Sequence, residues 1–177
     1  LSGYWTDREG YVENLHNGNE LNGTENHGLR GKLRWNFNER VDATLTTYYN
    51  KDDDTCCVLT LRDVSPDAKV FGFFPFDLSG IDVGKANDRI RLDQDFEGST
   101  ETSGGSLRVD ISAGEHTLTS ITALNDWQYD RLIDVDGSDF DIAGAIGAGH
   151  GGMYELSEMD SDFFSQEFRL LSPANDT

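Results

Sequence analysis

The sequence is poor in cysteine, proline and basic residues, and it contains no long apolar run. Its two cysteines, Cys56 and Cys57, are adjacent, so no disulfide framework can organise the fold. The pair either closes a strained ring or remains two thiols. Three prolines among 177 residues exclude a proline-rich linker, and no stretch of 18 apolar residues is present to form a transmembrane helix.

Positive charge is scarce, because 14 Lys and Arg stand against 33 Asp and Glu, for a net charge of −19. Phosphate contacts need a basic face, so we expect no nucleic-acid partner. The composition is still 36% hydrophobic and 11% aromatic, which is too apolar for a disordered chain. A transmembrane β-barrel is not excluded, because the alternating strands of a barrel contain no long apolar run.

Apolar and polar residues alternate along several segments, which is typical of strands with one apolar and one wet face. The clearest segment spans residues 29–37. Its large apolar positions are Leu29, Leu33, Trp35 and Phe37, and its basic positions are Arg30, Lys32 and Arg34. We expect six strands, at residues 4–13, 29–37, 41–50, 106–112, 117–130 and 164–170. In 117–130 the alternation is ambiguous, because Leu118 and Leu124 oppose Ile121 and Ala123.

Long and short connections alternate between these segments. Residues 52–104 and 131–161 form long loops, whereas 38–40 and 113–115 are tight turns. The loops are strongly acidic: 52–104 holds twelve acidic and five basic residues. This pattern predicts an all-β fold, an antiparallel transmembrane β-barrel fragment of about six strands with long extracellular loops and short periplasmic turns. A soluble β-sheet with one solvated basic face is the alternative.

On a lipid face near the membrane midplane, each basic residue of 29–37 would cost about 2–4 kcal/mol. We therefore expect Arg30, Lys32 and Arg34 to face the barrel lumen, where acidic groups can pair with them. Trp5, Tyr49 and Trp127 are candidates for interfacial aromatic girdles, with core packing as the alternative.

Several segments resemble the middle barrel strands of TonB-dependent receptors. They include Gly10-Tyr11-Val12-Glu13-Asn14, Gly28-Leu29-Arg30-Gly31, Thr117 to Ala123 with Trp127, and Phe164 to Pro173. The resemblance implies part of a 22-stranded barrel in the outer membrane of a Gram-negative bacterium, in contact with lipid, its own plug domain and a TonB-type energy transducer. It implies uptake of iron–siderophore complexes or other scarce nutrients. The 177 residues show no plug and no energy-coupling box, so we expect a fragment. A passive porin and a soluble calcium-assisted adhesion or carbohydrate-binding module are the alternatives.

Two groups of residues are candidates for ligand binding. Asp134, Asp136 and Asp139 have the oxygen density of a weak calcium site, although solvation alone accounts for most acidic runs. Four phenylalanines of the first long loop form either a small hydrophobic cluster or a ligand-contact surface. They are Phe71, Phe73, Phe74 and Phe76.

Catalytic motifs are not recognisable in the sequence. The four histidines are scattered without metal-ligand spacing, and no Gly-x-Ser-x-Gly elbow is present. The glycine-rich segment 144–152 lacks the lysine of a phosphate-binding loop. We therefore expect neither enzymatic activity nor a cofactor.

Overall fold

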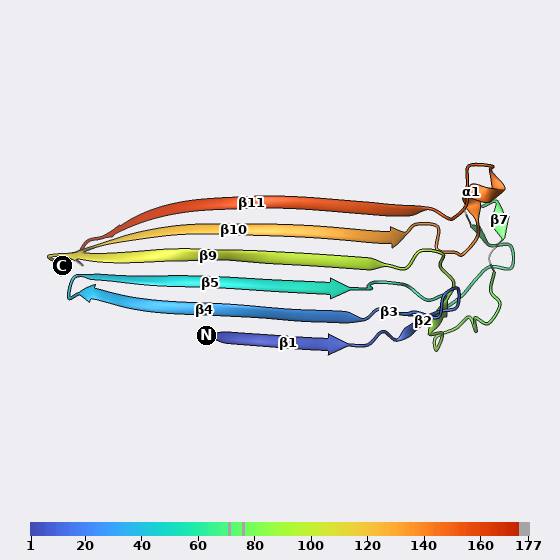
Figure 1. The fold of residues 1–177 in the computed structure, drawn as a ribbon, viewed down its shortest axis with the longest axis horizontal. Coiled ribbons are helices and arrows are strands. Elements are labelled where there is room, and N and C mark those ends of the chain that lie inside the picture. The colour runs from blue at the N-terminus through green and yellow to red at the C-terminus, as the bar shows by residue number, and fades with distance from the viewer. Residues whose placement is uncertain (71, 76, 174–177) are drawn as a thin grey trace.

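A computed structural model describes residues 1–70, 72–75 and 77–173. Its main feature is a single long antiparallel sheet (Figure 1). The strands, in spatial order, are β1 (Ser2–Arg8), β4 (Thr24–Asn38), β5 (Val41–Asp54), β9 (Glu97–Ala113), β10 (His116–Asp134) and β11 (Tyr154–Leu171). The prediction of an all-β fold with antiparallel strands is thereby confirmed.

Two tight turns lie at one end of the sheet, and all longer connections gather at the other (Figure 1). The β4–β5 turn is closed by Asn38, whose side-chain oxygen accepts hydrogen bonds from the backbone N–H groups of Arg40 and Val41 at 2.8 and 3.0 Å. In the β9–β10 turn, Gly114 has a φ of +64°, which glycine adopts without steric cost. The sequence thus encodes both reversals locally.

The strand register separates the sheet into an apolar and a polar face, because residues paired across antiparallel strands point to the same side. Leu33 pairs with Leu45, which pairs with Leu107. One residue away, Arg34 pairs with Thr44, which pairs with Arg108. Within 30–36, 42–48, 104–112, 117–125 and 163–171, every charged residue belongs to the polar face. These residues are Arg30, Lys32, Arg34, Asp42, Arg108, Asp110, Glu167 and Arg169.

Five of the six expected strands extend well beyond their expected ends, away from the turns, whereas the segment expected at residues 4–13 divides into β1, which ends at Arg8, and β2 in another sheet. Strand β5 continues to Asp54, β9 begins at Glu97, β10 runs to Asp134 and β11 begins at Tyr154, so both ends of each expected loop belong to strands. These additional strand residues are polar, even on the face that is apolar nearer the tight turns. One row of paired residues on that face consists of Asp7, Glu25, Asp53, Ser99, Asp130 and Glu158. Backbone pairing with neighbours carries strand structure past the point where the apolar alternation stops.

The remaining connections fold into a cap, defined here as residues 9–23, 55–70, 72–75, 77–96 and 135–153. It contains the short strands β2 (Val12–Asn14), β3 (Glu20–Leu21), β6 (Lys69–Val70), β7 (Phe74–Pro75) and β8 (Arg89–Ile90), and one helical turn, α1 (Ile142–Ala145). Its core consists of the buried side chains Val12, Leu21, Val58, Ile90 and Leu92. The expected loops are therefore partly structured.

Two buried asparagines fix distant segments of the cap to each other. The amide of Asn14 donates to the carbonyl oxygen of Leu92 at 2.9 Å and accepts from its N–H at 3.0 Å. In the same reciprocal way, Asn22 donates to the carbonyl of Val58 at 3.0 Å and accepts from its N–H at 2.7 Å. Asn14 thus extends the pairing of β2 with β8, and Asn22 extends the backbone hydrogen bonds that residues 22–23 make with Thr55.

The sheet does not close into a barrel within the described residues: β1 and β11 are its edge strands. Cys56 and Cys57 are joined by a disulfide at the start of the cap. Among the described residues, α1 is the sole helix, and none is long and apolar enough to cross a membrane.

Candidate functional site

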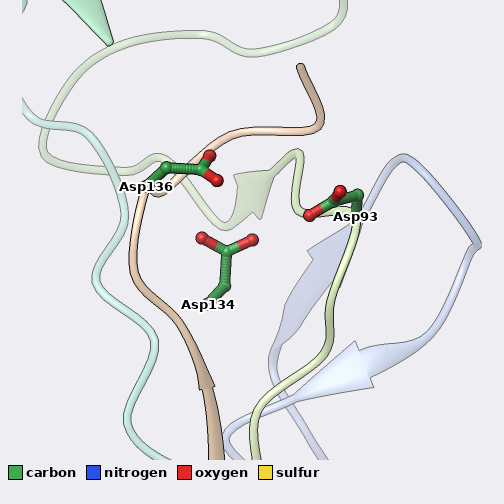
Figure 2. Close-up of side chains that lie close together, drawn as sticks. All are labelled: Asp93, Asp134 and Asp136. Atoms are coloured by element: carbon green, nitrogen blue, oxygen red, sulfur yellow. The ribbon is translucent and has the colours of Figure 1, made fainter. Parts of the chain in front are cut away.

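Three carboxylates from two separate connections converge at the junction of sheet and cap. Asp134 ends β10, Asp136 follows it by two residues, and Asp93 lies after β8 (Figure 2). One oxygen of each lies within 4.8 Å of one oxygen of each of the others. Asp134 and Asp136 are buried, with 5% and 8% of their surface exposed. We refer to Asp93, Asp134 and Asp136 as the aspartate triad.

Backbone N–H groups hold the three carboxylates in place. Gly137 donates to Oδ1 of Asp134 at 2.6 Å, and Met153 donates to Oδ2 of Asp136 at 2.6 Å. Gly152 donates to Oδ2 of Asp93. Ser138 adds two hydrogen bonds to Oδ1 of Asp136, from its N–H at 3.0 Å and from its hydroxyl at 2.6 Å. The positions of the acidic oxygens are therefore set mainly by the backbone of residues 137–153.

One buried oxygen of the triad has no such partner among the described residues. Oδ2 of Asp134 is buried and accepts no hydrogen bond within the part of the chain that the structure describes. In Figure 2 the three carboxylates form a triangle, and that of Asp134 faces the other two. An unsatisfied buried polar atom reduces the free energy of unfolding by about 1–3 kcal/mol, and by more when it is charged. A bound ligand or a proton at this oxygen would remove that cost.

Electrostatics at the triad oppose three simultaneous negative charges. The pKa of Asp134 is raised from 3.8 to about 7: burial is the largest cause, the charges of Asp136 and Asp93 add to it, and the hydrogen bond from the Gly137 N–H acts in the opposite direction. Each of these carboxylates repels the others in a medium of low polarity, and this repulsion favours either a proton or a cation among them.

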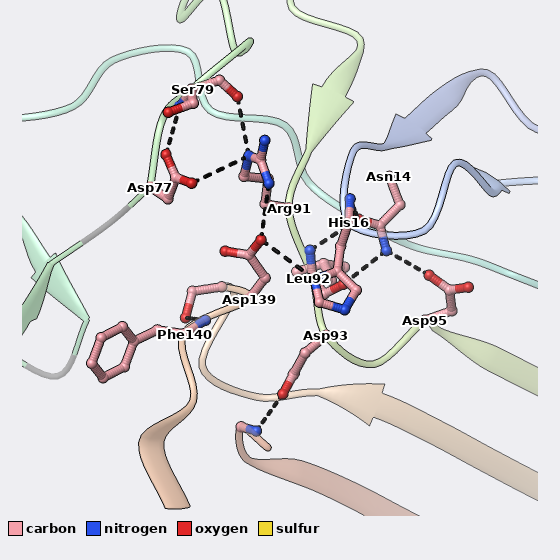
Figure 3. A network of polar contacts seen from close by, with 12 residues as sticks. Asn14, His16, Asp77, Ser79, Arg91, Leu92, Asp93, Asp95, Asp139 and Phe140 are labelled. Carbon is pink, nitrogen blue, oxygen red and sulfur yellow. Dashed lines mark hydrogen bonds and ion pairs between the residues drawn. The ribbon is translucent and has the colours of Figure 1, made fainter. Parts of the chain in front are cut away.

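The third expected metal ligand, Asp139, lies outside the triad. Its carboxylate oxygen Oδ2 accepts a hydrogen bond from Nη1 of Arg91 at 3.1 Å and lies 3.4 Å from Nδ1 of His16 (Figure 3). Arg91 also approaches Asp77 at 3.7 Å. Hydrogen bonds from Ser79, with a smaller contribution from Arg91, lower the pKa of Asp77. Asp139 thus belongs to an ion-pair network that fixes the cap.

Asp93 completes the triad and was not predicted from the sequence. It lies 41 residues before Asp134, in the other long connection, and no spacing rule joins the two. Only the pairing of β9 with β10 brings the segment that precedes Glu97 beside the end of β10.

The basic residues expected in a lumen lie together on the polar face. Arg30, Lys32 and Arg34 occupy alternate positions of β4, with Arg34 forming an ion pair with Asp42 at 3.2 Å. On the same face Arg108 is paired with Asp110 through two hydrogen bonds of 2.7 and 2.9 Å. This face therefore carries paired charges of both signs.

The four phenylalanines divide between described and undescribed residues. Phe71 and Phe76 lie outside the described residues. Phe74 stacks on Phe140 with ring centroids 5.0 Å apart, whereas Phe73 is 79% exposed. Within the described chain, Phe74 thus packs against the second long connection, and Phe73 is free to contact solvent or a ligand.

The expected girdle residues lie on different faces. Trp5 pairs with His27 and lies on the apolar face, two residues closer to the cap than the pair of Gly3 and Leu29. Trp127 lies on the polar face, where its ring stacks on that of Tyr129 with centroids 5.6 Å apart. Tyr49 pairs with Leu29 on the apolar side.

Comparison with known proteins gave no match to a family model, to a curated protein or to a solved structure. Two features of the chain indicate a function: the aspartate triad, which offers hard oxygen ligands, and the large sheet, whose two faces differ in polarity.

Proposed function

We propose that the long sheet is part of the wall of an outer-membrane β-barrel, with its apolar face toward lipid and its polar face toward the lumen. The observation that carries the proposal is the confinement of all charged side chains to one face over the turn-proximal half of the sheet. In lipid an unpaired charge on the outer face costs about 2–4 kcal/mol at the midplane, so such a separation is required there.

The exposure of the opposite face supports the same proposal. Leu33 is 59% exposed, Trp35 61% and Phe168 70%. Further large apolar side chains of that face are also exposed, namely Phe37, Leu45, Leu107, Ile111, Leu118, Leu124, Phe164 and Leu170. These side chains are 39–70% exposed. Covering the rest of them is therefore worth about 10–20 kcal/mol, at about 1.5–3 kcal/mol for each side chain buried from full exposure. A soluble monomer rarely exposes so large an apolar patch.

The dimensions of the sheet fit a membrane crossing. From Leu29 to Phe37 the apolar positions span nine residues, close to the 9–11 needed by a tilted strand. Beyond them, on the cap side, the row of Asp7, Glu25 and Asp53 crosses the same side of the sheet. The acidic row lies outside the hydrocarbon in this arrangement, and the cap lies on the extracellular side.

The barrel we propose belongs to a TonB-dependent receptor that takes up iron–siderophore complexes or another scarce nutrient, with energy from the inner membrane. This part of the proposal rests on the sequence resemblance of segments such as 117–123 and 164–173. The unpaired edges of β1 and β11 are where further strands of such a barrel would pair.

Tryptophan fluorescence in brominated lipid tests the membrane orientation. In a background in which every tryptophan of the full-length protein except Trp35 is replaced by Phe, Trp5 and Trp127 among them, the fluorescence reports the apolar face alone. The matched control carries Trp35→Phe and Arg34→Trp, which moves the fluorophore by one residue to the other face at the same depth. We expect at least twofold stronger quenching for Trp35. Equal quenching, or a monodisperse protein without detergent, contradicts the proposal.

Uptake measurements separate a receptor from a passive porin. We expect accumulation of a radiolabelled ferric siderophore or another nutrient in cells producing the full-length protein, and we expect it to stop when the proton gradient is collapsed. Uptake that persists without the gradient favours the porin, since diffusion through an open lumen needs no energy.

A further inference from the structure

We propose that the aspartate triad binds one calcium ion, which ties the cap to the end of the long sheet. The inference is independent of the membrane assignment, because it uses only Asp93, Asp134, Asp136 and the backbone around them. Three carboxylates supply hard oxygen ligands without nitrogen or sulfur, the chemistry that Ca²⁺ prefers. Mg²⁺ usually retains several waters and takes one or two carboxylates, so it fits this set less well.

The unpartnered oxygen of Asp134 is the observation that separates the triad from an ordinary acidic cluster. Most acidic surface residues are solvated, but Asp134 is 95% removed from solvent. Its Oδ1 is satisfied by the Gly137 N–H, whereas its Oδ2 has no partner in the described residues, and Figure 2 shows the Asp134 carboxylate facing those of Asp93 and Asp136. A cation at this point satisfies the buried oxygen and compensates the mutual repulsion of three carboxylates.

Two glycines let the backbone lie close to the carboxylates of the triad. A Cβ atom on Gly152 would lie 2.5 Å from Oδ2 of Asp136 and 2.7 Å from Oδ1 of Asp93. Gly137 has a φ of +69°, which turns the chain so that its N–H reaches Asp134. Both glycines therefore permit the close approach of backbone and acidic oxygens.

Calcium at this position would join three segments that are distant in the sequence. Asp93 precedes β9, Asp134 ends β10, and residues 152–153 lead into β11 and donate to Asp93 and Asp136. The net charge of −19 raises the local concentration of cations. For an extracellular site of this kind we expect a dissociation constant on the order of 10⁻⁴ M.

Calorimetric titration of the full chain with CaCl₂, after removal of divalent ions by a chelator, tests the site. We expect one ion per chain, with binding at least tenfold weaker in Asp134→Asn and in Asp93→Asn. Asp139→Asn is the matched control, because this carboxylate of the same connection is engaged by Arg91 and lies outside the triad. It should bind within twofold of the wild type. No binding below 10 mM, equal loss in the control, or tighter binding of MgCl₂ overturns the proposal.

Thermal unfolding distinguishes a variant that folds without binding calcium from a variant that does not fold. Without calcium, Asp134→Asn should melt at or above the wild-type temperature, since it removes charge from a buried site. With 10 mM CaCl₂ the wild type should gain several degrees and the variant should not. A gain of the same size in both proteins contradicts the assignment. Bromolipid quenching of Trp35 is unaffected by this result, so failure of the calcium site and failure of the membrane proposal are separable.

Discussion

Replacement of Asn14 by alanine should loosen the cap without disturbing the sheet. Asn14 is fully buried, and its amide is bonded to both backbone groups of Leu92, to Oδ1 of Asp95 at 2.7 Å and to the N–H of His16 at 3.1 Å (Figure 3). The variant leaves the N–H and the carbonyl of Leu92 without partners, and Leu92 is itself only 1% exposed. At about 1–3 kcal/mol for each orphaned group, the local cost is about 4 kcal/mol.

Hydrogen exchange followed by mass spectrometry measures this effect directly. A loss of about 4 kcal/mol corresponds to exchange about a thousandfold faster at Leu92, since 1.4 kcal/mol is a factor of ten. Peptides from β4 and β5 serve as an internal reference and should not change. Asn17→Ala is the control, because Asn17 is exposed and also donates to Asp95, at 2.9 Å. The reasoning is refuted when both variants accelerate exchange equally, or when the reference strands accelerate together with the cap.

Three further predictions concern the membrane face, the cap and the sheet. Leu33→Arg should cost about 2–4 kcal/mol of stability in lipid and reduce the yield of inserted protein, as measured by urea unfolding in vesicles and membrane fractionation. The hydrogen bond to Asp141 raises the pKa of His150, and the same bond, with backbone N–H groups, lowers the pKa of Asp141 to about 2. The stability of this contact should therefore be greatest between the ordinary pKa values of Asp and His. The stability of the contact should fall as pH rises through the elevated pKa of His150 and as pH drops through about 2. The rate of proteolysis within residues 141–152, measured across this pH range, reports that stability. Asp141→Asn should abolish the pH dependence. In Gly104→Ala, the new Cβ would lie 2.7 Å from both Oη of Tyr48 and the carbonyl oxygen of Leu124, so we expect a loss of about 1–3 kcal/mol in urea unfolding. Adding Tyr48→Phe should not restore it, because the carbonyl remains.

Local patterns predicted the strands because their causes are local. The alternation in 29–37 fixes which side chains share a face, since successive residues of a strand point to opposite sides. The register then places Leu33 beside Leu45 and Arg34 beside Thr44, as an apolar and a polar face require. The tight turns followed from short polar segments between two alternating runs.

Strand ends and the ambiguous segment needed the tertiary structure. In 117–130 both parities carry apolar residues, and only the neighbours decide between them: Leu118 pairs with Ile111 on the apolar face, whereas Ile121 pairs with Arg108 on the polar face. The polar ends of the strands, such as Glu97 to Gly104, are extended because they pair with neighbours on both sides. No alternation within a single segment reveals this.

The sequence by itself determined the fold class, the two-faced character of the sheet and the acidic nature of its long connections. All three depend on the order of residues within one segment. Only the tertiary structure decided that Asp93 joins Asp134 and Asp136 while Asp139 pairs with Arg91. The physical reason is that a cluster of ligands depends on which distant segments meet, and here the pairing of β9 with β10 and the turn at Gly137 bring them together.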